Sequence, residues 1–328
     1  MQETKETSLA QIYGASRDVA DAEREKLVRV AWYYYRDNLT QAQIAARLHV
    51  SRPTVARLLE RARSTGIVTI EIATSGIGGL ELSQSIRDRF SLDEVVILPQ
   101  PGEALSGEIT NSRLGHEGAQ YLRRYLTPGA IIGVGWGDTV LRSLLALTRA
   151  SLNGVTFATL TGGIEAYTRQ VSGATNNGIS DFIQFIPAPL MASTPRVATA
   201  LRSEQAVTSV LEAARRADAT IIGVGAALAS ATIMQNGIVK EEQIRSYQAD
   251  GAVGDIIGEF YDQSGRVLAT DLQKVRVGIE IRELRSMKNV IAVAGGSDKT
   301  EAIFGALAGG YVNVLITTED VARRLAEM

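Results

Sequence analysis

The stretch Leu39–Ile67, LTQAQIAARLHVSRPTVARLLERARSTGI, has the pattern of a helix-turn-helix. Thr40 is a favourable N-cap for a first helix, and Gln43 stands three residues later, which is the spacing of a capping box. The apolar residues that follow fall on one face at helical spacing. They are Ile44, Ala45 and Leu48.

A second helix is predicted after a short turn at His49 and Val50. Ser51 is its expected N-cap, and Pro53 stands in the first turn, where its missing N–H costs nothing. Its apolar side is formed by Val55, Leu58 and Leu59.

The outward side of this second helix carries arginine and threonine near its N-terminus, which suits reading of a DNA major groove. Guanidinium groups can bridge the two acceptors of guanine, while hydroxyl and amide groups can hold phosphate. Five arginines stand against one acid, Glu60, between residues 41 and 66 of a chain whose formal charge is −2. This local charge favours DNA binding over the alternative, a helical hairpin with a solvated basic face. The predicted DNA contacts are Thr40, Gln41, Ser51, Arg52, Pro53, Thr54, Arg57 and Arg61.

The composition of the 328 residues, 45% apolar and 21% charged, suits about two globular domains. There is no cysteine, so disulfides and thiolate metal sites are excluded, and two histidines cannot form a multi-histidine metal site. The polar N-terminus does not resemble a signal or transit peptide, and no apolar run approaches the about 18 residues of a membrane span. We therefore expect a cytoplasmic protein with no metal, no cofactor and no membrane association.

The predicted domains are a disordered tail over residues 1–20, a DNA-binding domain over 21–74 and an effector domain over 75–328. Residues 21–37 have the spacing of a bracing helix, with Leu27, Val30, Ala31 and Tyr34 inward. Three consecutive tyrosines, residues 33–35, cannot share one face, so at least one must point away from the local core. The alternating residues 67–74 predict a strand that could form a wing, and residues 75–79, SGIGG, mark the boundary.

Beyond a short helix over residues 80–90, apolar runs alternate with amphipathic segments. Such alternation predicts a mostly parallel sheet with helices on both faces, in which ligands bind at the carboxyl ends of the strands. The expected strands lie at 95–99, 130–137, 155–163, 218–226, 289–296 and 313–318, and the expected helices at 109–125, 139–149, 204–216 and 299–308.

Two glycine loops follow strands and open helices, an arrangement that suits an anion. The first is not a dinucleotide fingerprint because Asp138 stands where the third glycine would fall, and a tight strand-to-helix turn is the alternative. In the second, Lys299 lies in a first helical turn, which disfavours a cation unless an anion joins it; the alternative is a solvated surface lysine. The candidate residues in these loops are Gly133, Gly135, Trp136, Gly137, Asp138 and Thr139, and Gly295, Gly296 and Lys299.

Other polar candidates follow the remaining strands. Asp255, in GAVGDIIG, either caps a backbone turn or accepts hydrogen bonds from a polyol. Gly162 and Gly163, with Asn176 and Asn177 further on, could line the same site, and the stretch 187–189, PAP, suggests a bend at a strand end.

Six motifs of the chain stand together in this order: LTQAQIAARLHVSRPTVARLLERARSTGIV, IIGVGWGDTV, FIPAPL, ADATIIGVGA, GAVGDIIGEFYDQSGRV and VIAVAGGSDKTEAIFGALAGGYVNVLITTEDVARRL. With these motifs, over about residues 24–328, the chain resembles the SorC family of bacterial sugar-responsive transcriptional regulators. The resemblance implies a winged-helix-like DNA-binding domain and an effector domain similar in fold to sugar-phosphate isomerases and deaminases. It also implies dimers or tetramers and a phosphorylated sugar or related effector, with Asp255 on ligand hydroxyls, Lys299 on phosphate and the first glycine loop lining the site. The segment 158–177 is atypically long for this family, which leaves an unphosphorylated sugar or polyol open.

These observations predict a regulator of a carbohydrate or polyol catabolic operon that binds double-stranded operator DNA under control of a sugar, polyol or sugar-phosphate effector, and acts as a homodimer or homotetramer. One alternative is a sugar-phosphate isomerase-like enzyme with a helical appendage, but neither glycine loop has a histidine beside it and there is no cysteine nucleophile. The other is a nucleotide-dependent oxidoreductase, which the missing third glycine opposes. We therefore expect no enzymatic activity.

Overall fold

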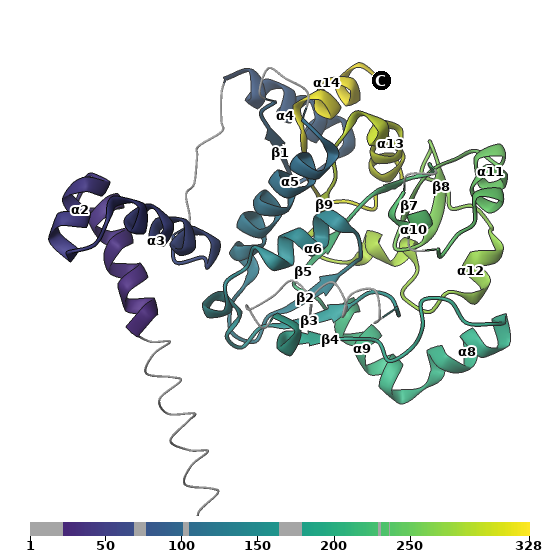
Figure 1. Cartoon of the computed structure of the whole chain (residues 1–328). Coiled ribbons are helices and arrows are strands. Elements are labelled where there is room, and N and C mark those ends of the chain that lie inside the picture. Colours follow the sequence, from purple (N-terminus) through teal and green to yellow (C-terminus); the bar gives the residue numbers. More distant parts are fainter. Residues whose placement is uncertain (1–21, 69–76, 101–104, 164–178, 229–230, 236) are drawn as a thin grey trace, which may run out of the picture. The chain divides into compact units, whose positions relative to one another are not determined.

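The computed structural model describes residues 22–68, 77–100, 105–163, 179–228, 231–235 and 237–328. The chain divides into two compact units, residues 1–73 and residues 74–328 (Figure 1). The predicted tail, most of the predicted wing and Asn176 and Asn177 lie outside the described residues.

The first unit contains a helix over residues 22–35, helix α2 (Gln41–Leu48) and helix α3 (Arg52–Ser64). Both predicted caps are present, and the capping box of Thr40 and Gln43 is complete. His49, at the end of α2, adopts a left-handed conformation that turns the chain toward α3. The three helices close on a small core of Leu27, Val30, Ala31, Ile44, Ala45, Val55, Leu58, Leu59 and Ala62.

The tyrosine run differs from the predicted inward face of the bracing helix. Tyr34 and Tyr35 are both exposed, whereas Tyr33 packs against the core. The guanidinium of Arg47, from α2, lies over the Tyr33 ring at 4.7 Å and covers it. The prediction that at least one tyrosine points away from the core is confirmed, but the assignment of Tyr34 to the inward face was wrong.

The second unit is built on a seven-stranded sheet in which every pairing is parallel, so the predicted α/β fold class is confirmed. Its strand order is β1-β10-β9-β5-β2-β3-β4. The strands are β1 (Glu94–Leu98), β2 (Ile131–Val134), β3 (Thr156–Thr159), β4 (Ile183–Gln184), β5 (Ala219–Ile222), β9 (Val290–Val293) and β10 (Val314–Thr318).

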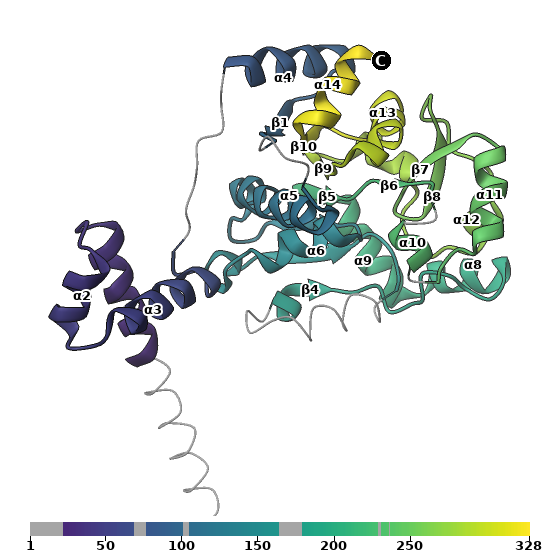
Figure 2. The same ribbon diagram turned by 45° about the horizontal axis from the view of Figure 1, so that its top comes forward.

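Helices cover both faces of this sheet (Figures 1 and 2). Successive residues of a strand point to opposite faces of the sheet and pack in two separate cores. Ile221, for example, packs with α5 and α6, whereas Ile222 packs with α4, α9, α13 and α14. The chain proceeds from β2 to β3 in one direction and from β5 to β9 in the other, so β2 and β5 flank the topological switch point, where ligands of doubly wound folds bind. The helices are α4 (Ile77–Phe90), α5 (Gly107–Leu122), α6 (Asp138–Leu145), α8 (Pro195–Ser203), α9 (Gln205–Arg215), α13 (Thr300–Ala308) and α14 (Glu319–Glu327), with 3₁₀ helices η1 (Arg123–Tyr125), η2 (Arg149–Leu152), η3 (Ile179–Phe182), η4 (Ile281–Ser286) and η5 (Ser297–Lys299).

A second, antiparallel sheet was not predicted. The expected strand at 218–226 is two strands, because the chain leaves the large sheet after β5 and enters the small one as β6 (Gly225–Ala226). The other strands are β7 (Ala252–Ile256) and β8 (Glu259–Asp262). They pack with α10 (Thr232–Gln235), α11 (Glu241–Ala249) and α12 (Asp271–Val275) around a core that includes Ile233, Ile244, Tyr247, Phe260 and Leu272.

In the part of the chain that the structure describes, no helix is long and apolar enough to cross a membrane. The same residues contain no group of three or more metal-ligating side chains.

Candidate DNA-binding surface and effector site

The N-termini of α2 and α3 carry positive partial charge that no acidic side chain in either first turn neutralises. The Thr40 hydroxyl accepts a hydrogen bond from the Gln43 N–H at 3.3 Å, and the Ser51 hydroxyl accepts one from the Thr54 N–H at 3.3 Å. The Ser51 and Thr54 hydroxyls also pair with each other at 2.7 Å. These hydroxyls fix the two helix starts, and the remaining amides suit a phosphate group.

The arginines predicted to contact DNA fall into two groups. Arg52 and Arg57 are exposed, and neither forms an ion pair with another described residue. Arg61 is instead paired with Glu23 at 2.5 Å, which ties α3 to the helix over residues 22–35. Gln41 is partly exposed and Pro53 is exposed at the start of α3. Arg52 and Arg57 are therefore the two predicted arginines of α3 that carry no ion pair with a described residue. Arg63, which was not among the predicted contacts, is exposed on the same helix.

The first glycine loop combines sheet residues with a turn. Gly133 lies inside β2, where a Cβ would come within 2.6 Å of the Thr220 hydroxyl. The Gly135 N–H donates to the Ile221 carbonyl at 2.8 Å, which extends the pairing of β2 with β5. Gly137 caps α6 with a φ of 134°, a conformation that favours glycine.

The side chains that follow this turn are engaged within the fold. The buried Thr139 hydroxyl donates to the Val293 carbonyl at 2.7 Å, which holds the start of α6 against the end of β9. The Asp138 carboxylate accepts hydrogen bonds from Asn111 and Arg142, both at 2.9 Å. Trp136 packs partly buried between the core of the large sheet and the core of the small one.

The second glycine loop closes the end of β9 against β10. Gly295 is buried against Thr318, and the Gly296 N–H donates to the Thr318 hydroxyl at 3.4 Å. Gly296 has a φ of 102°, and its carbonyl accepts a hydrogen bond from the Lys299 N–H at 2.9 Å. Lys299 is the N-cap residue of α13, and its side chain is partly buried.

Asp255 is the buried carboxylate of this region. It lies on β7 opposite Gly225, where a Cβ would come within 2.2 Å of the Asp255 Oδ1 atom, so the close approach of β6 requires glycine. Burial raises the pKa of Asp255 to about 6, and the Gly258 N–H and the charge of Lys299 oppose that rise. β7 packs on α13, since a Cβ on Gly254 would come within 2.5 Å of the Ala302 Cβ atom, and Lys299 is the N-cap residue of that helix. The structure therefore places Asp255 and Lys299 on neighbouring elements.

Gly162 and Gly163 lie where several backbone segments cross after β3. A Cβ on Gly162 would come within 2.5 Å of the Ala188 carbonyl oxygen. The N–H groups of Gly162 and Gly163 donate to the carbonyls of Val277 and Ala188, at 2.9 and 3.0 Å. Both glycines thus permit close packing with the bend at residues 187–189.

Sequence reasoning missed three contributors to this site. Gly225 allows β6 to approach Asp255, Thr318 holds the second glycine loop, and Gly223 lies against Gly137 at the switch point. The available signal was the repeated glycine of GVGA at 223–226, which was included within a single strand.

Comparison with known proteins agrees with these two halves. Residues 75–327 match the family model described as "Putative sugar-binding domain", and residues 21–68 match the "Homeodomain-like domain". The chain is a DNA-binding transcriptional regulator with a sugar-binding effector domain.

Its full-length relatives define the family. The chain is 37% identical to "Transcriptional regulator LsrR" of Klebsiella pneumoniae subsp. pneumoniae, over 93% of this chain and 94% of that protein, and 36% identical to the LsrR of Escherichia coli K12, over 92% and 94%. The solved structure of the full-length sorbitol operon regulator SorC from Klebsiella pneumoniae is 30% identical, covers 93% of this chain and 99% of that one, and has a TM-score of 0.65. The chain belongs to the SorC family of sugar-responsive transcriptional regulators. The match covers nearly the full length of these relatives, which are named as regulators, so the two enzyme alternatives are set aside.

Proposed function

We propose that this regulator binds the operator of a carbohydrate or polyol catabolic operon, and that a sugar, polyol or sugar phosphate bound in residues 75–328 controls the binding. The observation that carries the proposal is the buried Asp255 carboxylate on β7, a strand whose Gly254 packs against Ala302 of α13, the helix that Lys299 caps. A carboxylate accepts hydrogen bonds from sugar hydroxyls, and an ammonium group beside it attracts phosphate. The amides at the start of α13 add favourable partial charge for an anion.

The effector acts through its different affinity for two arrangements of the regulator. Closure of the effector domain around Asp255 and Lys299 changes subunit geometry, and with it the separation of the recognition helices. The half-sites of a two-fold dimer lie about one helical turn of DNA, or a multiple of it, apart. The regulator works in the cytoplasm, where its operator lies.

A homodimer or homotetramer is the proposed assembly. One helix-turn-helix contacts too few base pairs for selective binding. Val28, Trp32 and Tyr35 recur at helical spacing on the bracing helix, and all three are exposed, Trp32 by 54%. A second copy of this helix offers the same apolar face, as two-fold association requires.

A thermal-shift screen against sugars, polyols and their phosphates tests the effector assignment. A compound at about 100 times its Kd should stabilise the fold by ~2.7 kcal/mol. We expect Lys299→Ala to weaken binding of a phosphorylated hit far more than binding of its unphosphorylated analogue, because the lost group is the phosphate contact. Lys288→Ala, at an exposed position of the same domain, is the matched control.

Equal losses for the two analogues would remove Lys299 from the phosphate site. A hit with free sugars or polyols alone would retain the regulator and reject a phosphorylated effector. Turnover of a sugar phosphate by the purified protein would contradict the proposed role.

A further inference from the structure

The turn that joins β7 to β8 holds an isoleucine in an unfavourable conformation. Ile256 pairs with Glu259, so Ile257 and Gly258 form a two-residue hairpin loop. Both have positive φ, 50° for Ile257 and 81° for Gly258. Glycine suits such a position, whereas a β-branched residue there is strained. Strain of this kind persists only where the surroundings impose it, and it gathers at functional sites.

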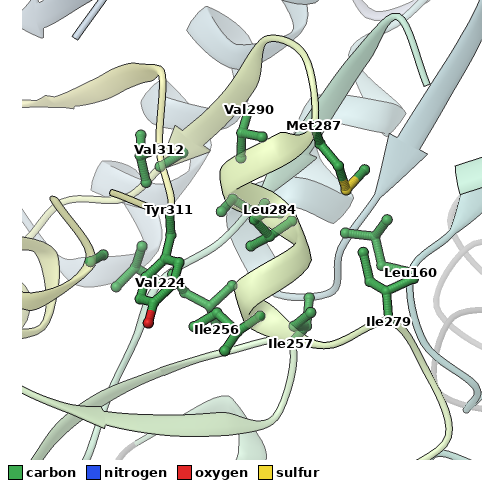
Figure 3. Packing of buried hydrophobic residues seen from close by; sticks show 14 of the residues in the cluster. Leu160, Val224, Ile256, Ile257, Ile279, Leu284, Met287, Val290, Tyr311 and Val312 are labelled. Atoms are coloured by element: carbon green, nitrogen blue, oxygen red, sulfur yellow. The ribbon is translucent and has the colours of Figure 1, made fainter. Parts of the chain in front are cut away.

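The isoleucine is held by its side chain and by its carbonyl. Ile257 is 3% exposed and belongs to the same core as Ile279 and Leu284. Figure 3 shows Ile257 and Ile279 below the helix that carries Leu284. The Ile257 carbonyl accepts a hydrogen bond from Arg276 Nη1 at 3.3 Å. The Arg276 stem lies against Gly258, where a Cβ would be 3.4 Å from its Cδ atom.

Arg276 is locked by a buried carboxylate. Its Nη2 atom donates to Glu259 Oε2 at 3.1 Å and also to the Ile279 carbonyl, and the side chains of Arg276 and Glu259 are 4% and 1% exposed. Glu259 accepts further hydrogen bonds from Gln273 Nε2, at 2.9 Å, and from the Ile281 N–H. A buried ion pair is weak support for stability because of its desolvation cost, so its retention here calls for another role.

That role follows from the peptide unit between Ile257 and Gly258. Its carbonyl accepts the bond from Arg276, and its N–H donates to Asp255 Oδ2 at 3.2 Å. One rigid, planar group therefore connects the guanidinium to the Asp255 carboxylate. Any rotation of this peptide that relieves Ile257 would also withdraw the hydrogen bond from Asp255.

We propose that Arg276, held by Glu259, is a positioning residue that fixes the Asp255 carboxylate for effector hydroxyls through the strained Ile257–Gly258 peptide. The proposal rests on the proposed function, since it takes Asp255 as the effector contact. It adds that effector affinity depends on a buried pair that does not touch the effector, and that the strain at Ile257 is sustained by this pair.

The test uses full-length protein and three variants. Arg276→Met combined with Glu259→Gln removes both charges, because removing one would leave the other buried and unpaired. Ile257→Gly keeps the left-handed turn accessible, removes its strain and frees the peptide. Asp255→Asn reports on the effector contact itself. The readouts are the Asp255 carboxyl titration by ¹³C NMR, the melting temperature, and calorimetric titration with ribose 5-phosphate, fructose 6-phosphate and sorbitol 6-phosphate.

We expect Asp255 to titrate at higher pH in the double variant and in Ile257→Gly, because the carboxylate loses its N–H donor. The affinity for the sugar phosphate that the wild type binds should fall about tenfold, as for the loss of one charged hydrogen bond. Ile257→Gly should show both effects together with a lower melting temperature, because the buried side chain leaves a cavity. The shifted titration of Asp255 in the folded variant is the effect that a purely stabilising role would not produce.

The positioning role would be overturned if Asp255 titrates as in the wild type both in Ile257→Gly and in the folded double variant. This outcome counts whether or not any of the three sugar phosphates binds. Arg276→Lys separates charge from geometry, because lysine keeps the positive charge but lacks the planar guanidinium that reaches Glu259 and Ile257 together. A wild-type titration of Asp255 in that variant would also overturn the positioning role. If Asp255→Asn binds the sugar phosphate as tightly as the wild type, the proposed function fails instead. If only Asp255→Asn loses binding, the proposed function stands and this inference fails.

Discussion

Asp255 shows how a candidate binding residue can oppose the stability of its own domain. Its carboxylate is buried against the backbone of Gly225, and within the described residues it accepts one backbone hydrogen bond, from Gly258. That bond and the charge of Lys299 only partly offset burial, so the pKa stays raised at about 6. A charged group retained under such a penalty is typical of a functional site.

We expect Asp255→Asn to stabilise the effector domain at pH 7.5 and not at pH 4. The folded-state pKa lies above the ordinary 3.8, so the folded state binds the proton more tightly. Stability is therefore complete below about pH 4, falls as the pH rises toward 6, and stays reduced above it. The raised pKa of Asp255 corresponds to a loss of folding stability of at most about 3 kcal/mol. Urea unfolding at both pH values measures it, with the exposed Asp250→Asn as control. A gain of equal size at pH 4 and 7.5 would mean that ionisation of Asp255 is not the cause.

At the scale of elements, most of the parallel sheet could be predicted because its central strands are buried on both faces and read as apolar runs. The two-residue edge strand β4 was missed, since Gln184 is exposed and the pair has no apolar run. The hairpin of β7 and β8 could not be predicted, because Asp255 and two glycines interrupt its apolar pattern. Its place is set by β6, which pairs with it from a distant part of the sequence. Asp255 and Lys299 were each proposed from local pattern, but the position of Asp255 depends on this pairing. The dual role of the peptide at Ile257 has no sequence signal, since isoleucine does not predict a left-handed turn.

The recognition helix α3 provides a matched pair of arginines. We expect Arg52→Ala to weaken binding to a duplex selected by the wild type from a random library, and to relax its sequence preference, by ~1–3 kcal/mol if the contact is bidentate to a base. Arg61→Ala should change binding less, because Arg61 already pairs with Glu23. Fluorescence anisotropy at several salt concentrations measures both, and effector affinity should stay constant. Unchanged affinity for Arg52→Ala would show that this face of α3 does not read DNA.

At the scale of the whole molecule, the two units have separate cores. The residues that pack Leu58 all belong to residues 27–68, and the cores around the two sheets contain none of them. Each unit therefore has the core that it needs to unfold as a cooperative body of its own.

This separation predicts that the effector stabilises one unit alone. Calorimetry of the full chain should show two transitions, and saturating effector should raise the one that belongs to residues 75–328, by ~2.7 kcal/mol at about 100 times its Kd. The transition of the DNA-binding unit should stay in place, since it contains no effector contact, and should rise instead with specific duplex. Leu58→Ala, which opens a cavity in the small core, should lower only that transition. A single transition that the effector shifts as a whole would contradict this prediction, because it would show that the two units unfold together.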